Sequence, residues 1–101
     1  MNMVKHIVMW RLRDGISKTA DAALIKSLLE GLGGKISGLF KIEVGINFIE
    51  DYNAADVVLY SEFTDRTALE TYQSHPLHLA VVAEVKARTV ERRSADYVVK
   101  N

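Results

Sequence analysis

The stretch VKHIVMWRLR, residues 4–13, alternates like a β-strand but carries apolar side chains on both of its faces. Val8 and Trp10 belong to one face, and Ile7 and Met9 belong to the other. A strand with one face in water would show polar residues at every second position. The sequence therefore predicts that this first strand is covered on both sides.

The rest of the chain continues with alternating helix and strand patterns. Ser17 is expected to cap a helix whose apolar stripe ends at Leu32, and Gly33 or Gly34 is expected to end that helix in a left-handed conformation. The order β-α-β-β-α-β predicts a ferredoxin-like α+β fold, with helices on one face of a four-stranded antiparallel sheet. Strands are expected over 39–49 and 56–63, and Gly45 in the first of these suggests a bulge or a close backbone approach. A short helix is expected over 66–73, capped by Thr64-Asp65. A further helix is expected from Pro76, with a basic end that runs to Arg93, and a last strand over 94–100.

The composition restricts the class of protein. The 101 residues are expected to form a single domain, 1–101, and they include 13 basic side chains, 13 acidic ones and no cysteine. Without a net positive charge, binding to nucleic acid or to an anionic membrane lacks its main driving force. The first residues do not have the pattern of a signal peptide, and the apolar runs are too short to span a bilayer. We therefore expect a cytoplasmic protein with no nucleic-acid or membrane partner.

The sheet face that the helices leave open is the expected interaction surface. Ile7 and Met9 would make this face apolar, and the hydrophobic fraction of 49% is high for a small domain that folds alone. A two-fold dimer that packs sheet on sheet would cover the face with one self-complementary patch. The expected partner is therefore a second copy of the chain.

All three histidines lie in two short segments of the sequence. His6 shares its strand face with apolar residues, and His78 follows Pro76 in the first turn of a helix, where the helix dipole disfavours imidazolium. Burial or the dipole would keep both rings neutral near pH 7, as a general base requires. Each ring has an equally simple structural explanation as a core or capping histidine. His75 is expected to shape or cap the turn, and Tyr72 either packs or donates a hydrogen bond to a developing oxyanion.

Several of these segments together resemble the Dabb family, the stress-responsive A/B barrel domains. The resemblance is carried by residues 4–11, 45–48, 63–72 and 75–78, together with Asp96-Tyr97. It implies a homodimer whose two sheets make a barrel, with a pocket between sheet and helices in each subunit. One branch of the family is a plant polyketide cyclase, and the positions of its acid–base residues match His6, Tyr72 and His78. Two of its supporting polar positions are occupied by Leu28 and Val57 in this chain, which implies a more apolar pocket.

These observations lead to one main hypothesis and two alternatives. A pocket for a small, mostly apolar molecule is expected to contain His6, Tyr72 and His78 as catalytic residues, with His78 as the base and the other two holding a carbonyl oxygen. The reaction would be a cofactor-free cyclisation, isomerisation or lyase reaction, with no metal and no cofactor. The alternatives are a non-catalytic small-molecule-binding or stress-related protein, and a cofactor-free monooxygenase. The expected substrate-binding residues are Val8, Trp10, Leu24 and Leu28.

Overall fold

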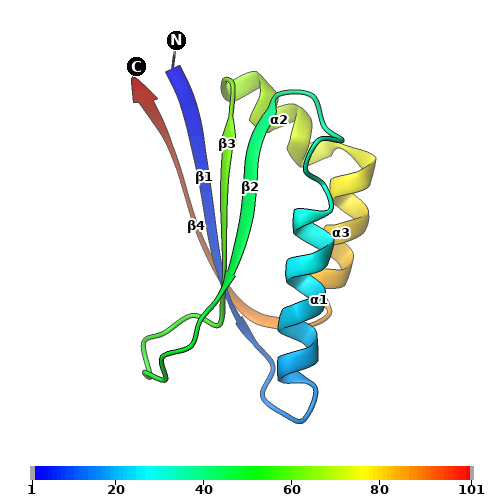
Figure 1. Cartoon of the computed structure of the whole chain (residues 1–101), viewed down its shortest axis with the longest axis vertical. Coiled ribbons are helices and arrows are strands. Elements are labelled where there is room, and N and C mark those ends of the chain that lie inside the picture. The colour runs from blue at the N-terminus through cyan, green and yellow to red at the C-terminus, as the bar shows by residue number, and fades with distance from the viewer. Residues whose placement is uncertain (1, 101) are drawn as a thin grey trace.

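A computed structural model describes residues 2–100 of the chain (Figure 1). Within these residues the chain forms four strands and three helices. None of the described helices is both long and apolar enough to cross a membrane. In chain order the elements are β1 (Asn2–Leu12), α1 (Lys18–Glu30), β2 (Leu39–Ile46), β3 (Val57–Phe63), α2 (Arg66–Ser74), α3 (Pro76–Lys86) and β4 (Thr89–Lys100).

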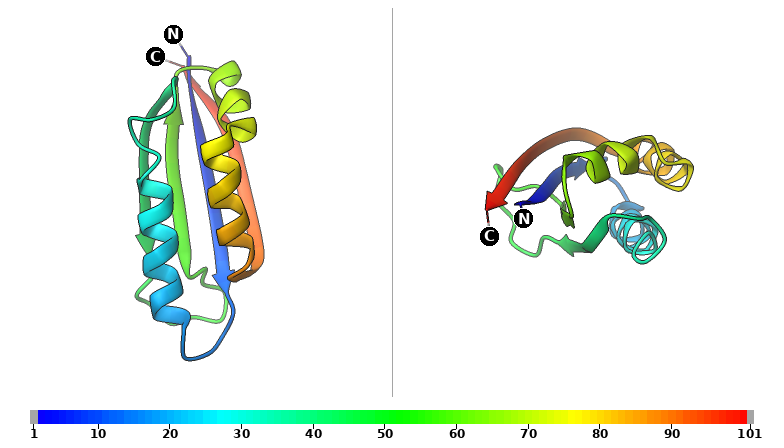
Figure 2. Two further views of the ribbon diagram at one scale, coloured as in Figure 1. Left: turned by 90° about the vertical axis from the view of Figure 1, so that its right-hand side faces the viewer. Right: turned by 90° about the horizontal axis from the view of Figure 1, so that it is seen from above.

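The strands form one antiparallel sheet in the order β2-β3-β1-β4. α1 and α3 lie side by side over one face of this sheet, and α2 lies near one end of the sheet on the same side (Figure 2). β1 is a central strand, because β3 pairs with one of its edges and β4 with the other. The predicted ferredoxin-like α+β fold is confirmed.

The core lies between the helices and the sheet face that they cover. Every second residue of β3 is buried, and β1 buries alternate residues from Val4 onward, which is the pattern of strands with one face against the helices. Val8 of β1, Phe63 of β3 and Ile25 of α1 are at most 1% exposed. Each such side chain contributes about 1.5–3 kcal/mol by leaving water. The same burial fixes which face of β1 meets the helices.

The turn between α2 and α3 forms as its sequence predicts. The Asp65 side chain caps α2 by accepting a 2.7 Å hydrogen bond from the Ala68 amide. His75 Nδ1 caps α3 in the same way, accepting from the Leu77 amide at 3.1 Å, and Pro76 occupies the first turn. The prediction that His75 caps the turn is confirmed.

The predicted boundaries of α1 are partly wrong. Ser17 precedes the helix, but its hydroxyl bonds to the Asp21 carboxylate at 3.1 Å and no side chain caps the helix start. The helix stops at Glu30, earlier than Leu32, and its C-cap Gly31 keeps a right-handed conformation. Gly34, with φ +78°, is left-handed but lies beyond the helix end, and Gly38, with φ +87°, is a second left-handed glycine before β2.

The junction of α3 and β4 also differs from the prediction. The helix ends at Lys86, and β4 begins at Thr89 rather than at Ser94. Residues 89–93 pair with the end of β1 in the register Trp10 to Arg92. Their charges suggested a solvated helix end, but charges are equally compatible with an edge strand, where the side chains reach water on both sides.

β2 is shorter than predicted and is irregular at its start. The register shifts between Leu39 and Lys41, which leaves Phe40 68% exposed, and the strand ends before Phe48, which is 90% exposed. Gly45 pairs in register with Val58, and a Cβ at Gly45 would lie 3.1 Å from a Val58 methyl carbon. The close approach predicted at this glycine is confirmed, whereas the bulge lies at the other end of the strand.

The sheet face opposite the helices is open. Ile7 is half-buried and Met9 is 46% exposed on this face. Tyr60 lies beside them, with the Lys5 ammonium 5.4 Å and the Lys41 ammonium 5.7 Å from its ring centroid. The connection between β2 and β3 reaches away from the helices on this side (Figure 1). The open face therefore has an apolar centre, a tyrosine ring flanked by two lysines, and a projecting loop.

Candidate functional site

A cavity of about 480 Å³ lies between α3 and the part of the sheet formed by β1, β3 and β4. This volume is in the range of small-molecule sites. β1 contributes His6, Val8 and Trp10 to its wall, and α3 contributes His78 and Val82. The cavity thus brings the two segments that contain the histidines to one place, although they are far apart in the sequence.

His6 is held by hydrogen bonds on its ring and on its backbone. Its side chain is 5% exposed, and its Nδ1 contacts Oδ1 of Asp96. Because a carboxylate only accepts, the proton of this hydrogen bond lies on Nδ1, and in the neutral ring Nε2 then carries the lone pair. The backbone carbonyl of His6 accepts a 2.9 Å hydrogen bond from the Ser61 hydroxyl. The ring is therefore fixed in orientation, with Nδ1 as the donor to Asp96.

Tyr72 is completely buried near the C-terminal end of α2. Its hydroxyl has no hydrogen-bond partner among the described residues. Burial raises the pKa of this phenol from 10.0 to about 12, so it stays protonated and remains a donor at neutral pH. A buried hydroxyl without a partner costs free energy in the folded protein, and such groups call for an explanation. Hydrogen bonding to a bound molecule is one explanation.

His78 is half-buried in the first turn of α3, and its Nδ1 also lacks a partner among residues 2–100. Burial is the main cause that lowers the pKa of His78. A hydrogen bond to the Gln73 backbone opposes it, and weaker repulsion from His6 and Arg92 adds to it. The ring is therefore neutral at pH 7. A neutral imidazole both donates and accepts, which suits it to polarise a carbonyl group.

The three rings form one cluster. The centroids of Tyr72 and His78 are 4.0 Å apart with an interplanar angle of 33°, and those of His6 and Tyr72 are 6.3 Å apart. Phe63 closes the far side of the cluster, with its centroid 4.9 Å from that of Tyr72. The two imidazoles line the cavity, whereas Tyr72 lies behind His78 and is not part of the wall. Substrate contact through Tyr72 would thus require the His78 ring to move aside.

Two of the four expected substrate-binding residues line the cavity, and the other two do not. Val8 and Trp10 line the cavity, whereas Leu24 and Leu28 do not. The buried stripe of α1 runs through Leu29, which does line the cavity, while Leu24 is 37% exposed on a different side of the helix. The leucines of α1 are compatible with more than one rotation of the helix about its axis. In the folded protein, packing against the sheet turns Leu29 toward the core.

Asp96 is a functional candidate that sequence reasoning did not select. It appeared there only as part of the family resemblance, because no feature of the last strand links it to a histidine 90 positions away. The structure identifies Asp96 through the pairing of the first strand with the last, which places His6 directly opposite Asp96. Alternation shows which residues share a face but does not fix the register between two strands.

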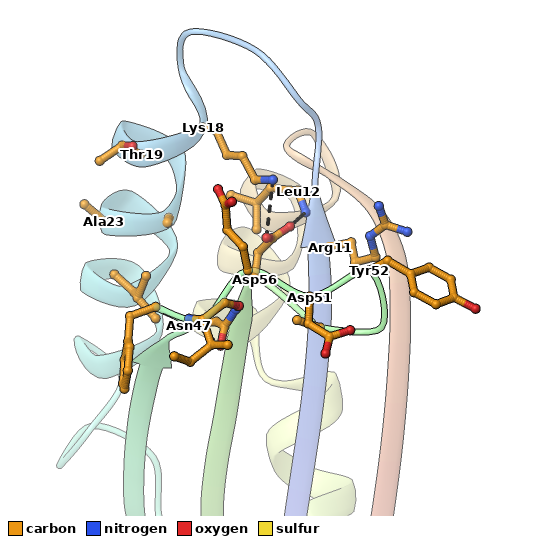
Figure 3. Close-up of a pocket in the computed structure, with 15 residues that line it drawn as sticks. Arg11, Leu12, Lys18, Thr19, Ala23, Asn47, Asp51, Tyr52 and Asp56 are labelled. Atoms are coloured by element: carbon orange, nitrogen blue, oxygen red, sulfur yellow. Dashed lines mark hydrogen bonds and ion pairs between the residues drawn. The ribbon is translucent and has the colours of Figure 1, made fainter.

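A second and larger cavity, of about 800 Å³, lies at the other end of β1, between α1 and the β2–β3 connection. Lys18 and Asp56 face each other across it, with Thr19 on the helix side and Tyr52 pointing outward (Figure 3). The Lys18 ammonium is 3.3 Å from the Asp56 carboxylate, which also accepts a 2.8 Å hydrogen bond from the Leu12 amide. The central polar groups of this cavity already have partners.

The third histidine lies outside the ring cluster. His75 uses its Nδ1 to cap α3 and does not line either cavity. Across residues 2–100, no three His, Cys, Asp or Glu side chains gather where they would hold a metal ion. The polar groups of the smaller cavity are thus two imidazoles, an amide and two cationic side chains.

Comparison with known proteins identifies relatives for nearly the whole chain. The sequence profile of the stress responsive A/B barrel domain family matches residues 4–99. The uncharacterized protein SCO4036 of Streptomyces coelicolor is 33% identical over 82 residues, which cover 80% of this chain and 84% of that protein.

Two solved structures illustrate the range of proteins that share this fold. A dimeric protein of unknown function with a ferredoxin-like fold from Bacteroides fragilis is 36% identical, with a TM-score of 0.83 and coverage of 94% of each chain. The hydroxynitrile lyase of Passiflora edulis superposes with the same TM-score of 0.83 over 97% of this chain and 94% of the lyase, at 15% identity. At that identity the likeness to the lyase concerns the fold alone.

Proposed function

The chain belongs to the Dabb family of stress responsive A/B barrel domains, and from this premise we propose that its smaller cavity performs cofactor-free acid–base chemistry on a small, mostly apolar carbonyl compound. The observation that carries the proposal is the contact between Asp96 and the Nδ1 of His6, whose ring lines this cavity. An imidazole held by a carboxylate has its tautomer fixed and its cation stabilised, as a general base requires.

The contacts favour a division of roles in which His6 is the base. His6 Nε2 removes a proton from the carbon next to the carbonyl group, and Asp96 stabilises the imidazolium that results. His78, which burial keeps neutral, donates a hydrogen bond to the enolate oxygen. Tyr72 supports the His78 ring from behind and supplies a second protonated donor if that ring moves. This arrangement exchanges the roles that the sequence suggested for the two histidines.

The direct test is exchange of carbon-bound hydrogen with solvent. In D2O, 2-octanone should lose a proton next to its carbonyl to His6 and regain a deuteron, without oxidation or loss of any group. We expect the protein to accelerate this exchange, followed by proton NMR, and H6Q to reduce the protein-catalysed rate by about 100-fold or more. T19V, in the larger cavity, is the matched control and should keep the full rate.

Two results would count against this function. Exchange that persists in H6Q would remove His6 as the base. Binding of 2-octanone without any protein-dependent exchange would instead support the non-catalytic binding protein, which is the alternative that the same cavity allows.

The proposal includes a homodimer that forms through the open sheet face. The dimeric Bacteroides fragilis relative supports it, as does the apolar centre around Ile7 and Met9 on that face. The β2–β3 connection projects on the same side and carries Phe48 and Tyr52, each 90% exposed, which would reach a second copy stacked on the sheet.

The oligomeric state tests this part of the proposal. M9E places a charge at the centre of the open face, and we expect it to convert a dimer into a monomer in light scattering after size exclusion. K35E, on an exposed turn outside that face, is the control that should stay dimeric. A wild-type protein that is monomeric at high micromolar concentration would contradict the proposed dimer.

A further inference from the structure

The polar mouth of the smaller cavity indicates the chemical class of its ligand. Lys86 at the end of α3 and Arg92 of β4 both line the cavity, and no Asp or Glu is among its lining residues. We propose that this cavity binds an apolar carboxylic acid, with the carboxylate at Lys86 and Arg92 and the apolar body directed toward the two imidazoles. The inference rests on the proposed function in taking this cavity as the ligand site.

Both cations lack an acidic partner within the described residues. Neither Lys86 nor Arg92 forms an ion pair in residues 2–100, and Arg92 donates only a 3.3 Å hydrogen bond, to the Ser94 hydroxyl. Two positive side chains at one cavity repel each other and favour an anion between them. An added carboxylate would accept charge-assisted hydrogen bonds from both.

The acidic residues near these cations are already paired with others. Arg88, two positions beyond Lys86, contacts both Asp21 and Glu84 at 3.3 Å. Glu91, adjacent to Arg92, faces the other side of the sheet and lies 3.7 Å from Arg11. These two carboxylates, Glu84 and Glu91, are therefore already engaged and do not neutralise Lys86 or Arg92.

The rest of the wall fits the apolar part of such a ligand. Beyond the mouth, the wall of α3 consists of Leu79, Val82 and Val85, which face Val8 and Trp10 of the sheet. Leu79 is 52% exposed although it belongs to this apolar wall, so a bound hydrocarbon chain would cover it. Arg92 lies opposite Trp10 in the strand register and close enough to His78 to lower its pKa, so the mouth and the imidazoles share one space.

A pair of probes that differ only in charge tests the inference. Octanoate and octanamide have the same length and shape, and both lack the reactive ketone. By isothermal titration calorimetry we expect octanoate to bind the wild-type protein at least tenfold more tightly than octanamide, since hydrogen bonds to charged groups exceed neutral ones in strength. Raising the salt concentration should weaken only the binding of octanoate.

Variants assign the preference to the two cations. K86M/R92M keeps the apolar stems and should remove the preference for octanoate while leaving the affinity for octanamide unchanged. K35M/K100M removes the same net charge from exposed positions outside the cavity, and it should keep the preference. Circular dichroism and thermal melting establish that each variant is folded, and K86Q/R92Q replaces the first pair if it is not.

The outcomes separate this inference from the proposed chemistry. Equal affinity for the two probes, no binding of octanoate at millimolar concentration, or a preference that survives in K86M/R92M would overturn the carboxylate site. H6Q should retain the preference for octanoate even though it loses proton exchange. A protein that prefers octanoate but never exchanges 2-octanone would therefore keep the ligand class and lose the reaction.

Discussion

Two cavities at opposite ends of β1 differ in a way that volume does not capture. The larger one, at about 800 Å³, is bordered by Lys18 and Asp56, which satisfy each other. The smaller one, at about 480 Å³, is bordered by two cations without acidic partners and by an imidazole nitrogen without a hydrogen bond among residues 2–100. Polar groups left without partners at a cavity wall indicate a ligand more strongly than the size of the cavity does.

The largest expected effect comes from removing the carboxylate that contacts His6, and the matched comparison removes a carboxylate from the larger cavity. D96N keeps the size of the side chain beside His6 but replaces the anion that stabilises its cation. We expect this change to lower the rate of deuterium exchange into 2-octanone by about 100-fold to 10,000-fold.

D56N is the comparison in the larger cavity, and it should leave the exchange rate unchanged. It weakens the contacts of Asp56 with Lys18 and the Leu12 amide, so it should lower the free energy of unfolding by about 1–2 kcal/mol. A loss of activity in D56N comparable to that in D96N would mean that the larger cavity also takes part in the reaction.

The second prediction compares buried Tyr72 with exposed Tyr52 at high pH. Tyr72 has a folded-state pKa of about 12 against 10.0 when exposed, so the folded state resists deprotonation. Its contribution is fully present below pH 10 and is lost as the pH rises toward 12, which should cost the protein about 2–3 kcal/mol of unfolding free energy. Urea unfolding at pH 8, 10 and 12 measures this loss.

Phenylalanine variants assign the loss to one tyrosine. Y72F should abolish that part of the alkaline decline, and Y52F, which alters a 90% exposed ring, should not. At pH 7, Y72F should also raise the unfolding free energy by about 1 kcal/mol, because it removes a buried hydroxyl that has no partner. A Y72F protein that is less stable at pH 7 would show that the hydroxyl is satisfied by a group such as bound water.

A smaller effect is expected on the acid side. Burial lowers the folded-state pKa of His78, so the unfolded chain binds more protons than the folded one below pH 6.5. Stability should therefore decrease as the pH falls from 6.5 through the folded-state pKa. H78Q should flatten this part of the profile in denaturant titrations, whereas H75Q should not. A profile identical to wild type in H78Q would contradict the burial of that ring.

Local patterns in the sequence were sufficient for most of the fold. The alternation in residues 4–13, the cap at Asp65 and the proline at the start of α3 each depend on neighbouring residues and were confirmed. The prediction was wrong for residues 89–93, which form part of β4. Their charged composition is compatible with both a helix end and an edge strand, so it does not distinguish the two.

The site was less accessible from sequence than the fold. His6, Tyr72 and His78 were selected together from the two short segments that contain the histidines and from the family resemblance, and their rings lie together in the structure. Asp96 depends on the register of two strands, and the inward side of α1 depends on its rotation, so neither follows from local periodicity. Contacts of this kind are set by the whole fold.

The separation of His6 from Asp96 by 90 positions has a consequence for how the protein acquires its site during folding. The helices and the β2–β3 pairing can form from nearby residues, but this contact forms only when the last strand docks on the first, a slow closure of a long loop. β4 is an edge strand, and edges open before cores do. Partial opening of this strand would separate His6 from Asp96 while leaving the helices intact. Hydrogen exchange at the amides of β4 would therefore report the fraction of folded molecules in which this pair is assembled.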